Sequence, residues 1–245
     1  LVSILALLIA AIITFVCIYF TRLQTISTIE KITNYNEYNL YRMDIKYDYS
    51  LDNVINYGID DTQSLVDAIV KESLLPIHMD VPDFGCSAFS IKDTDSNVLM
   101  GRNYDFKNDS SSMLLYCTPK DGYKSVAFAA LDNISANAAD SSIKSKLACL
   151  TAPFVCLDGM NEKGVSIAVL TLDSEPTHQK TGKPTIATSL AIRLVLDKAD
   201  TTEKAIELLK QYDMFEPECK FIDDVRRDGN RFTVETNRME SLCSQ

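Results

Sequence analysis

The first twenty residues form an almost unbroken apolar run from Leu1 to Phe20. Ser3 and Thr14 interrupt it, and no charged residue occurs within it. As a helix the run would rise about 30 Å, the hydrocarbon thickness of a bilayer, whereas a buried core helix is shorter and carries a polar stripe. We therefore expect residues 1–22 to be a transmembrane anchor, with the rest of the chain outside the cytoplasm. A signal segment is the alternative, although no small-x-small cleavage site follows the run.

The next part of the chain is polar. Residues 23–60 are rich in Asn, Tyr and Asp, so we expect a stalk here. A helix is predicted over 62–75, because leucine and isoleucine recur there at helical spacing before a proline. We interpret residues 23–85 as a segment distinct from the domain formed by residues 86–245.

From residue 86 onward the pattern is typical of short strands followed by helices. Strands over 86–91 and 98–102, separated by an acidic turn over 92–97, predict a β-hairpin. Further strands are predicted over 113–117, 124–130 and 165–172, and helices over 188–198 and 202–212. The last helix begins with a predicted capping box of Asp200 and Glu203. This order of elements predicts an α+β domain with a largely antiparallel sheet.

Composition and charge exclude several functions. The chain has 34 acidic and 24 basic residues and a net charge of −10, which argues against a nucleic-acid partner. Two histidines and the absence of a Cys-x-x-Cys pair argue against a metal site, and we expect no cofactor. Seven cysteines do not form a paired disulfide framework. The acidic turn resembles the start of a calcium loop, but Val98 occupies the required glycine position and Tyr104 that of the glutamate, so a hairpin turn is expected.

The candidate chemistry begins at Gly85 and Cys86. A lone cysteine at the start of a strand is usually a small core residue. Here Arg102 and Asp105 follow on the predicted return strand, which brings them back toward Cys86. Strict alternation would place Arg102 and Asp105 on opposite faces, so a bulge or turn at 103–104 is needed for both to face one site. The alternative is a surface ion pair of little energetic weight.

Three segments together resemble a known family: Cys86-Ser-Ala-Phe, Gly101-Arg-Asn-Tyr-Asp-Phe106 and Asp158-Gly-Met-Asn161-Glu-Lys-Gly164. This is the group of linear amide C–N hydrolases that includes choloylglycine hydrolases, penicillin V acylases and N-acylethanolamine acid amidases, within the N-terminal nucleophile hydrolases. The resemblance covers residues 84–212. It implies a four-layer αββα sandwich, here with an incomplete sheet as one alternative, because residues 216–245 diverge from the family pattern.

The resemblance also implies roles for individual residues. Cys86 would become the N-terminus by autocleavage after Gly85, so that residues up to 85 are a pro-segment. Its thiol would be the nucleophile and its α-amino group the base, with an ordinary pKa of about 7.7–8.0. Arg102 would lower the pKa of the thiol, and Asp105 would hold the α-amino group. Asn161 would donate to the tetrahedral oxyanion, although 161–164 is also an ordinary tight turn before a strand.

The family's second oxyanion asparagine has one candidate here, Asn237, at the end of a predicted strand over 231–236. The expected substrate is a small-molecule linear amide with an apolar acyl group: an N-acyl amide, a bile-salt conjugate or a penicillin V type amide. Loops over 109–113 and 173–183 are expected to line its pocket. Two alternatives remain open: a membrane-anchored binding or sensor domain in which Cys86 is structural, and an inactive family member. The oligomeric state is not predicted.

Overall fold

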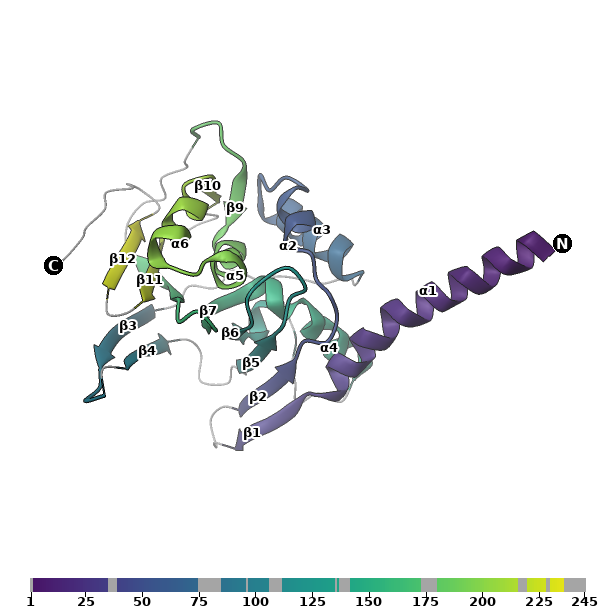
Figure 1. Cartoon of the computed structure of the whole chain (residues 1–245), viewed down its shortest axis with the longest axis horizontal. Coiled ribbons are helices and arrows are strands. Elements are labelled where there is room, and N and C mark those ends of the chain that lie inside the picture. The colour runs from purple at the N-terminus through teal and green to yellow at the C-terminus, as the bar shows by residue number, and fades with distance from the viewer. Residues whose placement is uncertain are drawn as a thin grey trace.

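The structure is a computed structural model and describes residues 2–34, 39–74, 85–95, 97–105, 112–134, 136, 142–172, 180–215, 220–227 and 230–235. One eight-stranded sheet organises these residues (Figure 1). In spatial order its strands are β1 (Glu30–Asn34), β2 (Asn39–Asp44), β5 (Ser112–Cys117), β6 (Ser125–Ala130), β7 (Cys156–Asn161), β8 (Ser166–Leu172), β11 (Lys220–Arg227) and β12 (Asn230–Glu235). The pair β2–β5 is parallel and the other neighbours are antiparallel. The predicted α+β class with a largely antiparallel sheet is confirmed.

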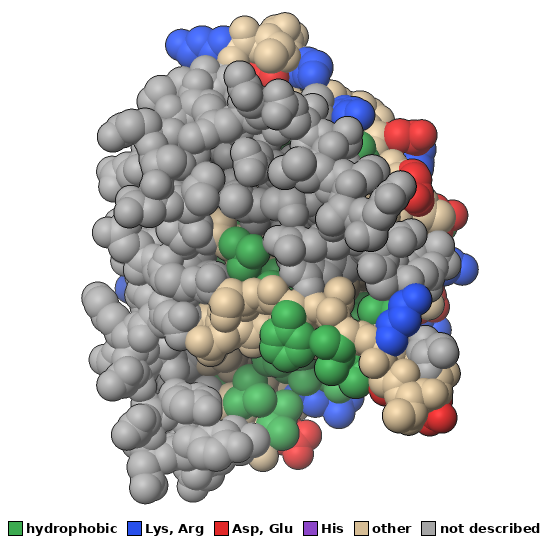
Figure 2. Space-filling view, turned by 90° about the vertical axis from the view of Figure 1, so that its left-hand side faces the viewer, with side chains coloured by type: hydrophobic (Ala, Val, Ile, Leu, Met, Phe, Trp, Pro, Cys, Tyr) green, Lys and Arg blue, Asp and Glu red, His purple; other side chains and the backbone are tan. Residues whose placement is uncertain are grey.

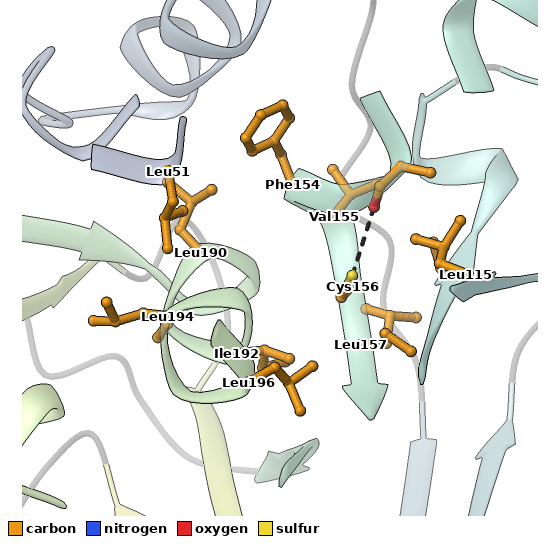
Figure 3. Packing of buried hydrophobic residues seen from close by; sticks show 14 of the residues in the cluster. Leu51, Leu115, Phe154, Val155, Cys156, Leu157, Leu190, Ile192, Leu194 and Leu196 are labelled. Carbon is orange, nitrogen blue, oxygen red and sulfur yellow. Dashed lines mark hydrogen bonds between the residues drawn. The ribbon is translucent and has the colours of Figure 1, made fainter. Parts of the chain in front are cut away.

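Helices cover one face of this sheet. They are α2 (Leu51–Ile55), α3 (Thr62–Ser73), α5 (Thr188–Lys198), α6 (Thr202–Leu209) and the 3₁₀ segment η2 (Cys149–Val155). Helix α5 packs directly on β7 and β8. Its residues Ile192 and Leu196 lie toward β7, and Leu51 of α2 lies next to Leu190 (Figure 3). The shorter elements are α4 (Ile143–Ala148), η1 (Leu131–Ile134) and the parallel pair β9 (Thr185–Ala187) and β10 (Asp213–Phe215).

The strands alternate between the two faces of the sheet, as their sequences require. In β5, Met113, Leu115 and Cys117 are buried on the helical side. Leu114 of β5 and Phe128 of β6 lie on the other side. On that side lies the antiparallel hairpin of β3 (Gly85–Lys92) and β4 (Val98–Asp105), and β3 contacts β8. Among the described residues, no helix makes a substantial contact with this hairpin.

Residues 39–73 belong to this folded unit. They include residues 39–60 of the range expected to be a stalk, and the predicted helix that follows, which is α3. Strand β2 pairs with β5 from Leu40 opposite Ser112 to Asp44 opposite Tyr116. Every second side chain is buried over the segment that follows from β2, at Tyr41, Met43, Ile45, Tyr47 and Tyr49. Strict alternation of this kind predicts a half-buried extended segment. The many Asn and Asp residues nearby hid that pattern.

The N-terminal apolar run forms helix α1 (Val2–Ser27), which projects away from the sheet (Figure 1). By length and composition it is the one helix of the described residues that could cross a membrane. Its C-terminal end contacts the domain, because the Arg22 guanidinium lies 5.0 Å from the Tyr47 ring centroid.

Most of the other predicted elements are present, and some of them end at different residues than predicted. Helix α5 matches its predicted range, whereas α6 ends at Leu209 and not at 212. The predicted capping box at Asp200 is wrong: Thr201 is the N-cap, and its hydroxyl accepts a hydrogen bond from the Lys204 N–H at 3.0 Å. Residues 220–227 and 230–235, within the segment 216–245 that was expected to diverge, form two further strands of the sheet.

Candidate active site

The β3–β4 hairpin places the predicted nucleophile position opposite the return strand. Cys86 pairs with Tyr104, Ala88 pairs with Arg102 and Gly85 pairs with Asp105. The register is regular throughout these paired residues, so the predicted bulge at 103–104 is not there. Positions 86, 102 and 104 therefore share one face of the hairpin, and position 105 lies on the other. Positions 86 and 102 are diagonal neighbours on the two strands, about 7–8 Å apart across the hairpin and within reach of a long side chain.

The structure describes the Arg102 side chain in detail. Its Nε lies 3.2 Å from Oδ2 of Asp158 on β7, and both side chains are more than nine-tenths buried. Its Nη2 donates to the carbonyl oxygen of Val169 on β8 at 3.3 Å. Its guanidinium carbon lies 4.8 Å from the centroid of the Tyr104 ring. Arg102 thus joins the hairpin to β7 and β8 on the side of the sheet away from the helices.

Asp158 is a site residue that the sequence analysis missed. Burial raises the pKa of its carboxyl group to about 6, while the Arg102 cation and a hydrogen bond to the Phe128 backbone act in the opposite direction. Burial outweighs the ion pair because a desolvated carboxylate loses the stabilisation that water gives its charge. The available signal was the position of Asp158 at the start of the family-like segment that ends at Gly164.

A cavity of about 560 Å³ opens beside this ion pair. Its walls are largely apolar and come from strands β2, β4, β5, β6 and β7: Leu40, Met100, Leu114, Val126, Phe128, Ala129, Ala130, Leu157, Gly159 and Met160. Its polar groups are Arg102, Tyr104, Ser112 and Asp158. Volume and lining match a small-molecule site, in which apolar walls hold the ligand and a few polar groups orient it.

The face of the hairpin opposite Arg102 carries exposed apolar side chains toward its turn. Phe89, Ile91 and Leu99 are each about half exposed on it, and the Phe89 ring covers Gly101. Hydrophobic side chains gather on this side of the molecule (Figure 2). The hairpin therefore places Arg102 and Tyr104 at the cavity on one face and exposes apolar side chains on the other.

Asn161 is not brought next to Arg102. It lies on the helical side of β7, where its Nδ2 donates to the carbonyls of Leu196 at 3.1 Å and Ala199 at 2.7 Å. Its Oδ1 accepts from the N–H groups of Lys163 and Val165. The side-chain amide donates to two carbonyls of the fold and accepts from two turn N–H groups, so in the structure Asn161 has the role of a tight-turn residue. The oxyanion role stays a prediction that would require the amide to turn away from α5.

Several predicted positions lie outside what the structure describes. Its account includes the backbone of Cys86 and Asp105 but not their side chains, and it does not include Asn237. Of the two loops expected to line the pocket, the first reaches the cavity at Ser112. Residues 109–111 and 173–179 lie outside the described ranges. Contacts among the three predicted catalytic groups at positions 86, 102 and 105 therefore stay predictions.

The class to which this fold and site correspond is that of the linear amide C–N hydrolases. A sequence model described as "Linear amide C-N hydrolases, choloylglycine hydrolase family" matches residues 86–228, more than half of the chain. The chain belongs to this family, as the sequence motifs predicted. The match begins at Cys86 and extends beyond residue 212, where the resemblance was expected to end.

The solved structures that match include a conjugated bile acid hydrolase variant from Clostridium perfringens, at 19% identity and a TM-score of 0.42. That match covers 63% of this chain and 49% of the other. A penicillin V acylase from Agrobacterium tumefaciens matches at 14% identity and a TM-score of 0.39, covering 63% of this chain and 48% of the other. The chain thus spans about half the length of these proteins. No curated protein matches the sequence.

Proposed function

We propose that this protein is a cysteine-nucleophile hydrolase of linear, non-peptide amides and that it matures by cleavage of the Gly85–Cys86 bond. The observation that carries the proposal is the hairpin register, which puts position 86 diagonal to Arg102 on one face. Arg102 itself lines a largely apolar cavity. Family membership, with a match that starts at Cys86, supports the same chemistry.

In the proposed maturation, the Cys86 thiol attacks the carbonyl carbon of Gly85. The acyl group moves from nitrogen to sulfur, which frees the α-amino group of Cys86. Water then hydrolyses the thioester and releases a new carboxyl group on Gly85. A glycine at this position leaves the carbonyl open to attack, because it has no Cβ.

In the proposed turnover, the α-amino group takes the thiol proton and the thiolate attacks the substrate amide. The amine leaves with that proton, and water hydrolyses the thioester on Cys86. A guanidinium close to the thiol favours the thiolate, which is the role proposed for Arg102. Asp105 is proposed to hold the α-amino group. Because the register places position 105 on the opposite face, beside Gly85, this role requires the end of β4 to rearrange once cleavage frees residue 86. Asn161 or Asn237 is proposed to donate to the oxyanion.

The cavity supports a substrate with an apolar acyl group. Leu114, Phe128 and Met160 would contact this group, while the amide carbonyl would point toward Arg102. Candidates are an N-acyl amide, a bile-salt conjugate and a penicillin V type amide. We further propose that the exposed hairpin face belongs to the inner part of a four-layer αββα sandwich, and that α1 anchors the protein outside the cytoplasm.

Intact mass and N-terminal sequencing of the purified protein test the proposal. We expect a chain that begins at Cys86, and its loss in Cys86→Ala, whereas Cys17→Ala is the matched control because Cys17 lies exposed on α1. Hydrolysis of a panel of N-acyl amides should disappear with the same variant. A full-length chain that binds but does not hydrolyse these amides would favour the sensor alternative. A processed chain without turnover would identify an inactive member.

A further inference from the structure

Asp158 is a buried acidic side chain at the wall of the cavity, and the proposed chemistry does not use it. Its Oδ2 lies 3.2 Å from Nε of Arg102, and both residues line the cavity. The other buried ion pair described in the protein, Arg193–Asp197, lies within α5 and is braced by Ser125 and Tyr49. That second pair lies in the core, away from the cavity, and has a structural explanation.

We propose that Asp158 is the positioning residue for Arg102: it fixes the guanidinium at the polar end of the cavity and thereby sets how strongly Arg102 acts on the Cys86 thiol. This inference rests on the proposed function. The ion pair holds Nε from β7, and the Val169 carbonyl holds Nη2 from β8. Because two neighbouring strands contact adjacent nitrogens, the guanidinium is placed relative to the sheet and not only to its own hairpin.

The same contact has an electrostatic consequence. A carboxylate at 3.2 Å offsets part of the guanidinium charge, so the effect of Arg102 on a nearby thiol is weaker when Asp158 is ionised. Arg102 from β4 is the described cation that acts on Asp158. The buried Cys156 thiol on β7 lies within range of its charge, and β6 contributes the Phe128 backbone. Asp158 therefore favours the proposed reaction by positioning Arg102 and opposes it by offsetting the charge of Arg102. Substitution can separate these two effects.

Two substitutions make that separation. Asp158→Asn keeps a side chain of the same size beside Nε but removes its charge, whereas Asp158→Ala removes both the side chain and the charge. For Asp158→Ala we expect kcat per processed chain to fall at least tenfold, with KM changed less than threefold. For Asp158→Asn we expect kcat within about threefold of the parent protein. We also expect its pH profile of iodoacetamide alkylation at Cys86 to move to lower pH.

The control is Asp44→Asn, which removes a carboxylate from another Arg–Asp pair, with Arg42 at 3.1 Å and partly exposed. It should leave kcat and the alkylation profile unchanged. Thermal unfolding of each variant shows whether a loss of activity comes from unfolding, since a purely structural Asp158 would change stability but not the thiol profile. The inference is overturned if Asp158→Ala keeps kcat within twofold and both variants alkylate with the parent profile.

Failure of this inference differs from failure of the proposed function. If the unsubstituted protein neither exposes an N-terminal Cys86 nor hydrolyses amides, the proposed function itself is wrong. If it does both and the Asp158 variants behave like Asp44→Asn, only the role of Asp158 is wrong.

Discussion

At the residue scale, the most informative groups are two side chains of one strand that point to opposite faces of the sheet. Asp158 lies at the cavity and Asn161 lies under α5. Three positions apart on a strand, they cannot share a face. The segment 158–164 therefore contains one residue that lines the cavity and one that stabilises the packing of α5 on the sheet.

The buried Asp158 carboxyl makes folding stability depend on pH. Its folded pKa of about 6 lies above the ordinary 3.8, so the folded state binds a proton more readily than the unfolded state between these values. Its contribution to stability is complete below about pH 4 and is lost as pH rises through 6. The expected loss is at most about 3 kcal/mol. Denaturant unfolding from pH 4 to pH 7 should show this loss in the parent protein and not in Asp158→Asn, and parallel curves for the two proteins would contradict it.

Substitution of Asn161 should affect folding before it affects catalysis. Asn161→Ala leaves the Leu196 and Ala199 carbonyls at the end of α5, and two turn N–H groups, without their partner. We expect a loss of about 3 kcal/mol or more in the free energy of unfolding. The control is Asn53→Ala, whose side chain is exposed. A variant of unchanged stability that has lost kcat would instead support the oxyanion role.

At the element scale, the close approach of β6, β7 and α5 requires a glycine between Asp158 and Met160. A Cβ on Gly159 would lie 2.6 Å from the Val126 carbonyl oxygen and 2.7 Å from Leu196 Cδ1. These neighbours belong to the cavity wall and to the helical layer respectively, so the added methyl group would push the layers apart.

Gly159→Ala should therefore destabilise the protein by about 1–3 kcal/mol and weaken substrate binding. Gly101→Ala is the matched control, because the nearest atoms to a Cβ there belong to the ring of Phe89, an exposed side chain and not backbone. Chemical denaturation of both variants checks the difference. Equal stabilities would show that the β6–β7 contact is not as tight as described.

The sequence predicted some elements well and others poorly, for physical reasons. The strand pattern around Cys86 and the helix over 188–198 have clear periodicity and local boundaries, and both are present. β7 was not predicted because Pro153 just before it and Gly159 within it are residues typical of turns, although the strand is buried between other elements. The site was predicted only in part, because the contact of Arg102 with Asp158 joins residues 56 positions apart in sequence and depends on how the hairpin lies on the sheet.

At the scale of the whole molecule, residues on both sides of the proposed cleavage site share one core. Residues 39–73 contribute a strand of the sheet and many buried side chains, among them Met43, Val54 and Ile69. Cutting one peptide bond after this structure has formed removes none of these contacts.

The two pieces should therefore stay together after cleavage. We expect the N-terminal piece and the piece that begins at Cys86 to co-elute in size-exclusion chromatography in detergent, and to separate only in denaturant. Elution of the second piece alone from a native column would show that residues 39–73 do not hold it as described. An uncleaved Cys86→Ala protein gives the reference elution volume.

The parallel pairing of β2 with β5 also bears on how the protein can be produced. A gene that starts at Cys86 would leave β5 as a bare sheet margin with unpaired amide and carbonyl groups, beside an apolar surface made for Tyr41 and Met43. Such a product is expected to aggregate during expression. Recombinant production of the proposed product that begins at Cys86 therefore has to start from a chain that includes residues 39–73, or to supply the missing strand on a second polypeptide.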